Sequence, residues 1–152
     1  YESLSEKMKS FLLKLNAVHG FSEKYKKSIA FQESKNEITK FDNDYINYKK
    51  NFNNEVVHPI IRTHPETKKK CLYVNPNFTL RINDLTSKES SVLLDYLYTH
   101  SSSPENLFRY SWQPKTLAIW DNRCTMHYAI NDYLGHERVM HRMVVMEDSR
   151  PY

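Results

Sequence analysis

The chain has 152 residues, 39% hydrophobic and 26% charged, which is enough for one domain with a buried core. No apolar run approaches the length of a membrane span, and no basic leader precedes a short apolar stretch, so we expect no membrane partner. The net charge of +4 would suit nucleic acid, but lysines such as Lys24 and Lys68 stand near acids or in expected turns. We therefore expect solvated surface lysines and no nucleic-acid partner.

The amphipathic pattern at the start of the chain predicts a helix over residues 3–18. Ser3 and Glu6 have the spacing of a capping box, and His19-Gly20 is a plausible stop. The apolar positions recur at helical intervals, at Leu4, Met8, Phe11, Leu12, Leu15 and Val18.

The middle of the chain changes from polar sequence to a β pattern. Residues 32–55 show no sustained period and are interpreted as a surface insertion or a mobile lid. A strand over 56–62, interrupted by Pro59, and a second strand over 71–74 flank a turn, which predicts a hairpin.

A second helix and a set of strands complete the predicted elements. Thr86 and Glu89 again have capping-box spacing, and the helix is expected to continue to about His100. Four strands are expected in the last third, over 108–112, 116–120, 125–129 and 138–146. Together these elements predict a β-rich α+β fold with antiparallel strands and flanking helices, which needs further strands to close.

The cysteines and the first residues bear on context. Cys71 and Cys124 have neither zinc-ligand nor redox spacing, and both lie in or beside apolar runs, so buried free thiols are expected. That fits a reducing compartment, and we expect a cytoplasmic protein. The chain starts with Tyr1 in place of an initiator methionine, so we expect a fragment or a processed chain.

The final strand combines charged and apolar side chains on one face. Because strand side chains alternate, Arg138 and Arg142 share a face with methionine and valine, with Cα atoms about 13 Å apart. If that face points inward, each guanidinium needs an anion, and two separate anions suit this spacing. A solvent edge with two surface arginines is the alternative. His127, in the preceding strand, is either a structural histidine or a metal ligand with partners elsewhere.

Two segments of the last third carry a family resemblance. Residues 116–133 resemble the "WDNR…T.HYA..DY" segment of the taurine dioxygenase (TauD/TfdA) family of Fe(II)/2-oxoglutarate-dependent dioxygenases, and residues 138–142 resemble its closing "R.MHR". A histidine, ten residues, an arginine, three residues and an arginine recur in this order.

The resemblance extends over most of the chain. Residues 1–5 with 17–19 resemble a helix that follows the family's first metal-ligand strand, and residues 62–65 with 71–79 resemble its mid-chain hairpin. Residues 32–55 match most poorly. The resemblance implies that residues 1–152 are the C-terminal part of one double-stranded β-helix (jelly-roll) domain, incomplete because the N-terminal part is absent.

The resemblance also assigns roles to single residues. His127 matches the family's distal histidine ligand of iron, and Arg138 matches the arginine that binds 2-oxoglutarate. A planar guanidinium suits that task because it binds a carboxylate through two hydrogen bonds. Arg142 matches the arginine that faces the substrate's sulfonate. The expected pocket is completed by aromatic residues, with Phe78 and Phe31 as substrate-binding residues and Trp120 as a wall.

The implied reaction needs Fe(II), 2-oxoglutarate and O₂. It hydroxylates a small sulfonate such as taurine and releases sulfite, with succinate and CO₂ as co-products. Because Arg142 favours an anionic head group without choosing among them, an alkyl sulfate or an aryloxyacetate is an alternative substrate. Small anions, and copies of the same chain in a homo-oligomer, are the expected partners.

The sequence departs from the family at the other two iron ligands. The family's His-x-Asp pair is expected upstream of Tyr1, and His64-Pro65-Glu66, which has His-x-Glu spacing, is rejected because it matches a hairpin element. We therefore expect this chain alone to be inactive. A non-catalytic jelly-roll remnant is the second hypothesis, and absence of a His-x-Asp pair from the complete gene would favour it.

Overall fold

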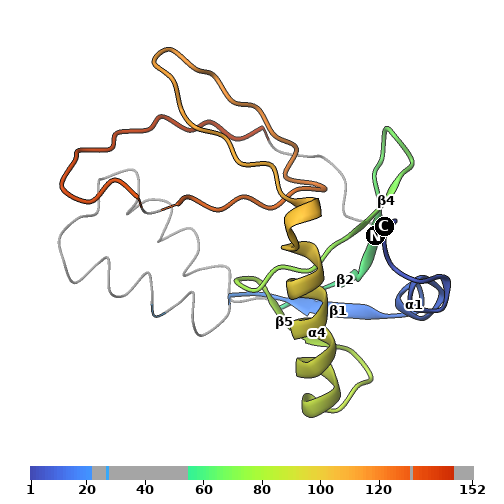
Figure 1. The fold of residues 1–152 in the computed structure, drawn as a ribbon. Helices are drawn as coiled ribbons and strands as arrows, with labels where there is room; N and C mark the ends of the chain where they lie inside the picture. The colour runs from blue at the N-terminus through green and yellow to red at the C-terminus, as the bar shows by residue number, and fades with distance from the viewer. Residues whose placement is uncertain (22–26, 28–54, 131, 146–152) are drawn as a thin grey trace.

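The computed structural model describes residues 1–21, 27, 55–130 and 132–145. Figure 1 shows two regions of different character. The helices and strands gather in a packed region, called here the body, which comprises residues 1–21 and 55–106. The orange-to-red trace of residues 107–130 and 132–145, called here the arm, runs as extended chain and turns.

The first helix, α1, spans Glu6–Leu12 and is shorter than the sequence pattern predicts. Its N-cap is Ser5, whose side chain accepts from the Met8 backbone N–H at 3.3 Å, so the predicted capping box at Ser3 and Glu6 is wrong. The end of the predicted helix is instead strand β1, Asn16–His19. Tertiary pairing overrides the helical pattern there, because β1 has a neighbouring strand on each side.

Strand β1 is the centre of a three-stranded antiparallel sheet. It lies between β2, Val56–Pro59, and β5, Thr79–Ile82. Ala17 pairs with His58 on one side and with Ile82 on the other, and the β1–β5 register shifts between Val18 and His19.

The predicted hairpin is confirmed as a separate two-stranded sheet. Strand β3, Ile61–Thr63, pairs antiparallel with β4, Lys70–Leu72. The predicted strand over 56–62 is split into β2 and β3, as the proline at 59 led us to expect. Lys68 adopts a positive φ of 59° in the connecting turn.

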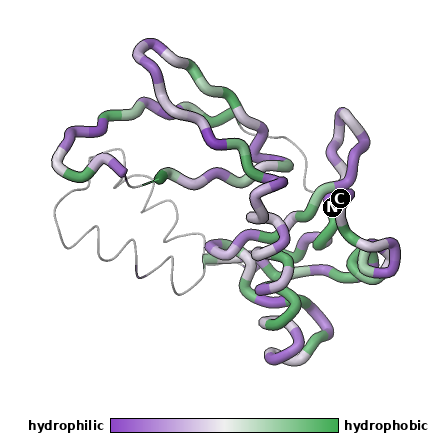
Figure 2. Tube along the Cα trace, in the orientation of Figure 1, coloured by the Kyte–Doolittle hydropathy of each residue, from purple (hydrophilic) through white to green (hydrophobic). Residues whose placement is uncertain are grey.

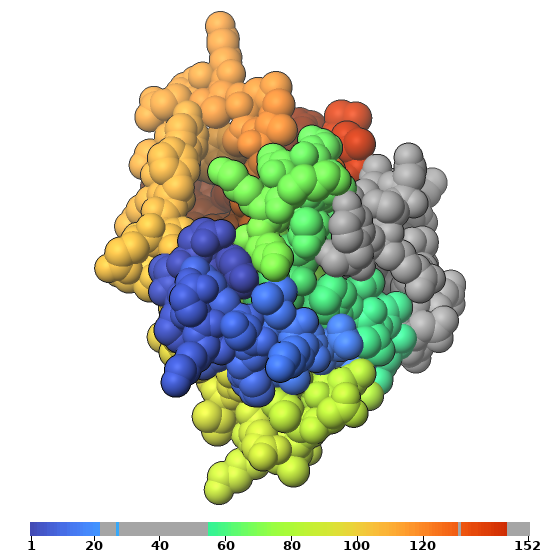
Figure 3. All heavy atoms as spheres, turned by 90° about the vertical axis from the view of Figure 1, so that its right-hand side faces the viewer, coloured from blue at the N-terminus to red at the C-terminus, as the bar shows by residue number. Residues whose placement is uncertain are grey.

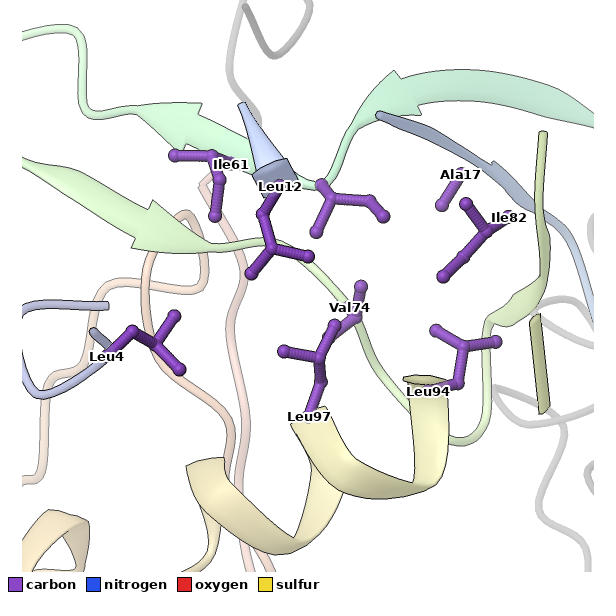
Figure 4. Close-up of a cluster of buried hydrophobic side chains, with 9 residues drawn as sticks. Leu4, Leu12, Ala17, Ile61, Val74, Ile82, Leu94 and Leu97 are labelled. Carbon is purple, nitrogen blue, oxygen red and sulfur yellow. The ribbon is translucent and has the colours of Figure 1, made fainter. Parts of the chain in front are cut away.

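The second predicted helix is confirmed as α4, Ser87–Ser101, followed by a short 3₁₀ helix, η1, Pro104–Asn106. Thr86 and Glu89 form the expected capping box. Ser90 on α4 accepts the backbone N–H of Ile82 at 2.8 Å and so joins the helix to β5. Figure 4 shows where α4 meets the sheet and the hairpin, in a cluster formed by Leu4, Leu12, Ala17, Ile60, Ile61, Val74, Ile82, Leu94 and Leu97.

The four strands predicted in the last third are not formed in the arm. Its described residues 107–130 and 132–145 contain turns and extended chain without strand pairing, and Met146 lies outside the described residues. A strand needs a hydrogen-bonded neighbour, whereas backbone hydrogen bonds in the described arm close local turns such as Asp121–Thr125. Apolar residues recur along the arm, as Figure 2 shows in green, and many are exposed, including Ile119, Met143 and Val145.

The described residues therefore form an α+β arrangement with antiparallel sheets and no closed barrel. The buried-thiol prediction holds in part, because Cys71 is half-buried but Cys124 is exposed. The predicted lid over 32–55 lies outside the described residues except for Glu55. Within the part of the chain that the structure covers, no helix has both the length and the apolarity to cross a bilayer.

Candidate functional site

Asp121 of the arm forms a hydrogen bond with the body. Asp121 Oδ1 accepts from the backbone N–H of Arg123 at 2.8 Å and from its Nε at 2.9 Å. Asp121 Oδ2 accepts from Arg123 Nη2 at 2.6 Å and from His64 Nε2 at 3.0 Å. The Arg123 guanidinium, with a smaller contribution from the His64 hydrogen bond, holds the pKa of the Asp121 carboxyl well below its usual range. The negative carboxylate is therefore the stable form of this anchor.

The hydrogen bonds of His64 assign its tautomer. Its Nδ1 accepts from the backbone N–H groups of Glu66, at 3.3 Å, and Thr67, at 3.2 Å. Nδ1 therefore carries the lone pair, and Nε2 carries the proton that is donated to Asp121. This neutral imidazole bridges the β3–β4 turn and the arm, and Figure 3 shows the green hairpin against the orange part of the arm.

The same atoms resemble a metal site but are used for other contacts. Ligand atoms of His64, Asp121 and Cys124 lie within 4.8 Å of one another. However, the His64 nitrogen on that side donates a proton, the Asp121 oxygens bind Arg123, and partial desolvation of its sulfur raises the pKa of the Cys124 thiol. Glu66 binds Arg123 at 2.9 Å, whereas His64 binds Asp121. The two residues with His-x-Glu spacing thus have different partners. We interpret the cluster as the anchor of the arm.

The predicted iron ligand lies beside the predicted pocket wall. The rings of Trp120 and His127 have centroids 4.9 Å apart, and Trp120 Nε1 donates to Asn122 Oδ1 at 2.9 Å. Partial burial lowers the pKa of His127, and the positive charge of nearby Arg142 adds to this effect. Both effects favour the neutral form of the His127 ring, which is the form that binds a metal. In the described arm, Trp120 and His127 are thus in contact, and Arg142 lies near enough to His127 for its charge to act on the ring.

The second arginine has a different neighbour. The Arg138 guanidinium lies over the Tyr133 ring, 5.4 Å from its centroid. Arg138 and Arg142 are both exposed, and so are Val139 and Met143 on the opposite face of the segment. Within the described arm, the expected inward face is therefore open to solvent, with neither arginine enclosed.

The predicted substrate-binding aromatics are not placed on the arm. Phe78 lies in the body, in the turn before β5, and Phe31 lies outside the described residues. Asp121, Arg123 and His64 were not predicted as a group from the sequence. Asp121 and Arg123 lie in the motif that suggested the family, and a closely spaced acid and base beside an apolar run was the available signal.

Comparisons with known proteins agree on one family. The sequence model of the taurine catabolism dioxygenase TauD, TfdA family matches residues 1–144. An alkylsulfatase of Acinetobacter baylyi is 35% identical over 95% of this chain and 44% of its own length. An alpha-ketoglutarate-dependent sulfonate dioxygenase of Saccharomyces cerevisiae is 44% identical over 57% of this chain and 20% of its own length.

The structural comparison points in the same direction. The crystal structure of a taurine dioxygenase from Burkholderia xenovorans aligns with 74% of this chain and 31% of its own, with a TM-score of 0.53 and 29% identity. The chain thus spans less than half the length of each of these three relatives.

Proposed function

Because this chain belongs to the taurine catabolism dioxygenase TauD, TfdA family, we propose that it supplies part of an Fe(II)- and 2-oxoglutarate-dependent dioxygenase. The proposed reaction hydroxylates a small sulfonate such as taurine and releases sulfite, succinate and CO₂. The observation that carries this proposal is the contact of the His127 and Trp120 rings, 4.9 Å apart between centroids, with the charge of Arg142 near enough to act on the imidazole.

His127 fits one position of an iron site, and its neutral ring is the form that coordinates. Bound iron and 2-oxoglutarate would supply the activation of O₂. The sequence holds no His-x-Asp pair, so in this proposal the other two protein ligands come from outside these 152 residues. Arg138 would bind the far carboxylate of 2-oxoglutarate, and Arg142 the anionic group of the substrate.

A second substrate class has specific support. The Acinetobacter baylyi relative is named an alkylsulfatase, and a relative from Pseudomonas putida is named an alpha-ketoglutarate-dependent sulfate ester dioxygenase. An alkyl sulfate presents the same kind of tetrahedral anionic group to Arg142 as a sulfonate does. An aryloxyacetate would present a planar carboxylate instead.

A chimera tests the proposal directly. Residues 1–152 would be joined to the part of the Acinetobacter baylyi relative that the match does not cover, and succinate release would be measured with Fe(II), 2-oxoglutarate and each anion. We expect release that depends on a sulfonate or a sulfate ester. A folded chimera that produces no succinate with any anion would favour the non-catalytic remnant.

Variants at the two arginines separate their roles. We expect Arg138→Lys to raise the KM for 2-oxoglutarate and Arg142→Lys to raise the KM for the substrate, because lysine cannot bind an anion through a planar pair of donors. Equal effects of both variants on both KM values would contradict the assignment.

The proposal includes an oligomer and a location. The exposed apolar side chains of the arm favour self-association, which analytical ultracentrifugation measures, and a clean monomer at high concentration would contradict it. A cytoplasmic location fits the two free cysteines.

A further inference from the structure

The turn that presents Phe78 is held by the segment at the end of β1. The backbone N–H of Gly20 donates to the Phe78 carbonyl at 2.8 Å. His19 Nδ1 lies 3.4 Å from the hydroxyl of Thr79, and the rings of Phe21 and Phe78 meet edge to face with centroids 6.0 Å apart. Three consecutive residues, His19 to Phe21, therefore contact two consecutive residues of the turn.

An irregularity in the sheet sets the position of this turn. His19 pairs with Thr79 and Val18 with Arg81, so Leu80 is an extra residue in β5. A Cβ on Gly20 would lie 3.0 Å from Leu80 Cδ1, so glycine leaves room for the Leu80 side chain at this point. Such bulges bend a strand and change the direction of the neighbouring side chains, which here include Phe78.

His19 is an unusual residue to bury at this point. It is 8% exposed, and its Nε2 has no hydrogen-bond partner among the described residues. Its ring contacts His58 and Tyr73, with a centroid separation of 5.4 Å in each case. Burying an unpartnered nitrogen costs free energy that an apolar side chain would not cost. Stability alone therefore does not account for a histidine here, whereas its Nδ1 supplies a hydrogen-bond partner for Thr79.

We propose that His19 is a positioning residue for the substrate pocket. With the Gly20 backbone it fixes the turn from Asn75 to Thr79, and Phe21 supports the ring of Phe78 from the side. Thr79 transmits this restraint, because its hydroxyl also accepts the backbone N–H of Asn75 at 2.8 Å. The inference rests on the proposed function and on the expectation, from the family resemblance, that Phe78 lines the substrate pocket.

Two substitutions of similar polarity separate positioning from simple packing. Asparagine places an amide nitrogen close to the position of the histidine Nδ1, whereas glutamine places it near Nε2. We expect His19→Asn to keep the exchange rate of the Gly20 amide hydrogen near the wild-type rate. We expect His19→Gln and His19→Leu to raise it roughly fivefold. The same rate in the asparagine and glutamine variants would overturn the proposal.

Global stability is controlled with a core variant. Leu94→Ala removes a buried side chain and weakens the whole body, so hydrogen exchange of its slowly exchanging amides should become faster throughout. His19→Leu should speed exchange mainly in the turn, and its midpoint of urea unfolding should be unchanged or higher. A uniform rise of exchange in His19→Leu, with a lower urea midpoint, would show a purely structural histidine.

Kinetics of the chimera add an independent result. His19→Leu should raise the KM for the anionic substrate about fivefold and leave the KM for 2-oxoglutarate unchanged, with rescue by His19→Asn. An equal rise in both KM values would contradict the positioning role. If the chimera lacked dioxygenase activity, the proposed function would fail, while the exchange rates would still decide whether His19 fixes this turn.

Discussion

The body and the arm use the same kinds of residues with opposite results. In the body, Leu12, Ile60 and Leu97 are completely buried, and nine apolar residues form one cluster. In the arm, Ile119 is 88% exposed and Met143 is 96% exposed. The body buries its apolar side chains because its strands and helices pack against one another, whereas the arm exposes similar side chains to solvent.

The difference shows that strand formation depends on tertiary partners as well as on the local sequence pattern. The arm has alternating apolar residues that suit strands, but its described part has turns and an anchor where paired strands would lie. The hydrogen bond of Asp121 with His64 holds the arm against the β3–β4 hairpin. The proposed iron ligand, His127, follows Asp121 by six residues. Function in this chain is thus proposed mainly for the region that contributes least to the core.

The largest effect is expected at the proposed ligand in the arm. Replacing His127 by alanine removes the only metal ligand proposed in this sequence, so succinate release by the chimera should fall at least about a hundredfold. Trp120→Phe, which keeps an aromatic wall beside the imidazole, is the matched control and should fall much less. Undiminished release by the alanine variant would remove His127 from the site.

The next effect compares packing in the two regions. Leu97→Ala leaves a cavity in the body and should lower the free energy of unfolding by about 2–5 kcal/mol. Met143→Ala removes a side chain that is 96% exposed and should change it by less than about 0.5 kcal/mol. Urea unfolding of both variants measures the difference. A similar loss in both would mean that the arm packs as tightly as the body.

The sequence predicted elements best where their determinants are local. The capping box at Thr86 and the turn between β3 and β4 are encoded by neighbouring residues, and both were confirmed. The helix over 3–18 was wrong at its end because Asn16–His19 pairs with strands more than 35 residues away in the sequence. Helical periodicity in a short segment does not reveal such partners.

In the candidate site too, local sequence predicted some features, whereas contacts between distant residues were not predicted. The family motif indicated His127 and Trp120, and the structure brings these two rings together. The hydrogen bond of His64 with Asp121 joins residues 57 positions apart, and no local pattern predicts it. The roles of Arg138 and Arg142 in anion binding remain predictions that the proposed kinetic tests address.

A smaller effect depends on pH and belongs to the body. Burial, with a further contribution from nearby His58, lowers the pKa of His19 from 6.5 to about 4. As the pH falls below 6.5, the unfolded chain binds a proton that the folded chain does not, so this stability is complete above pH 6.5 and lost by about pH 4. The expected loss is about 3 kcal/mol.

Two variants show which region carries this pH dependence. Urea unfolding between pH 7 and 4 should show a weaker dependence in His19→Leu than in the wild type. His136→Asn, at an exposed histidine of the arm, should leave the dependence unchanged. A steep wild-type slope that persists in His19→Leu would assign the effect to another group.

The smallest effect concerns the connection between the two regions. Asp121→Asn removes the charge that accepts hydrogen bonds from Arg123 and His64, and it should cost about 1–2 kcal/mol, because solvent screens a partly exposed pair. The arm should then be cleaved faster in limited proteolysis, while the body stays intact.

An exposed ion pair within the arm is the matched control for this prediction. Asp132 lies 3.8 Å from Arg109, and both side chains are more than 60% exposed, so Asp132→Asn should change the free energy of unfolding by less than about 0.5 kcal/mol.

The lowered pKa of Asp121 also predicts how its contribution to stability depends on pH. The stabilising effect is present above the usual carboxyl pKa of 3.8 and is lost as the pH falls below that value. The asparagine variant should therefore differ from the wild type at pH 7 and approach it in strong acid. A difference that stays constant with pH would mean that the charge of Asp121 does not hold the arm to the hairpin.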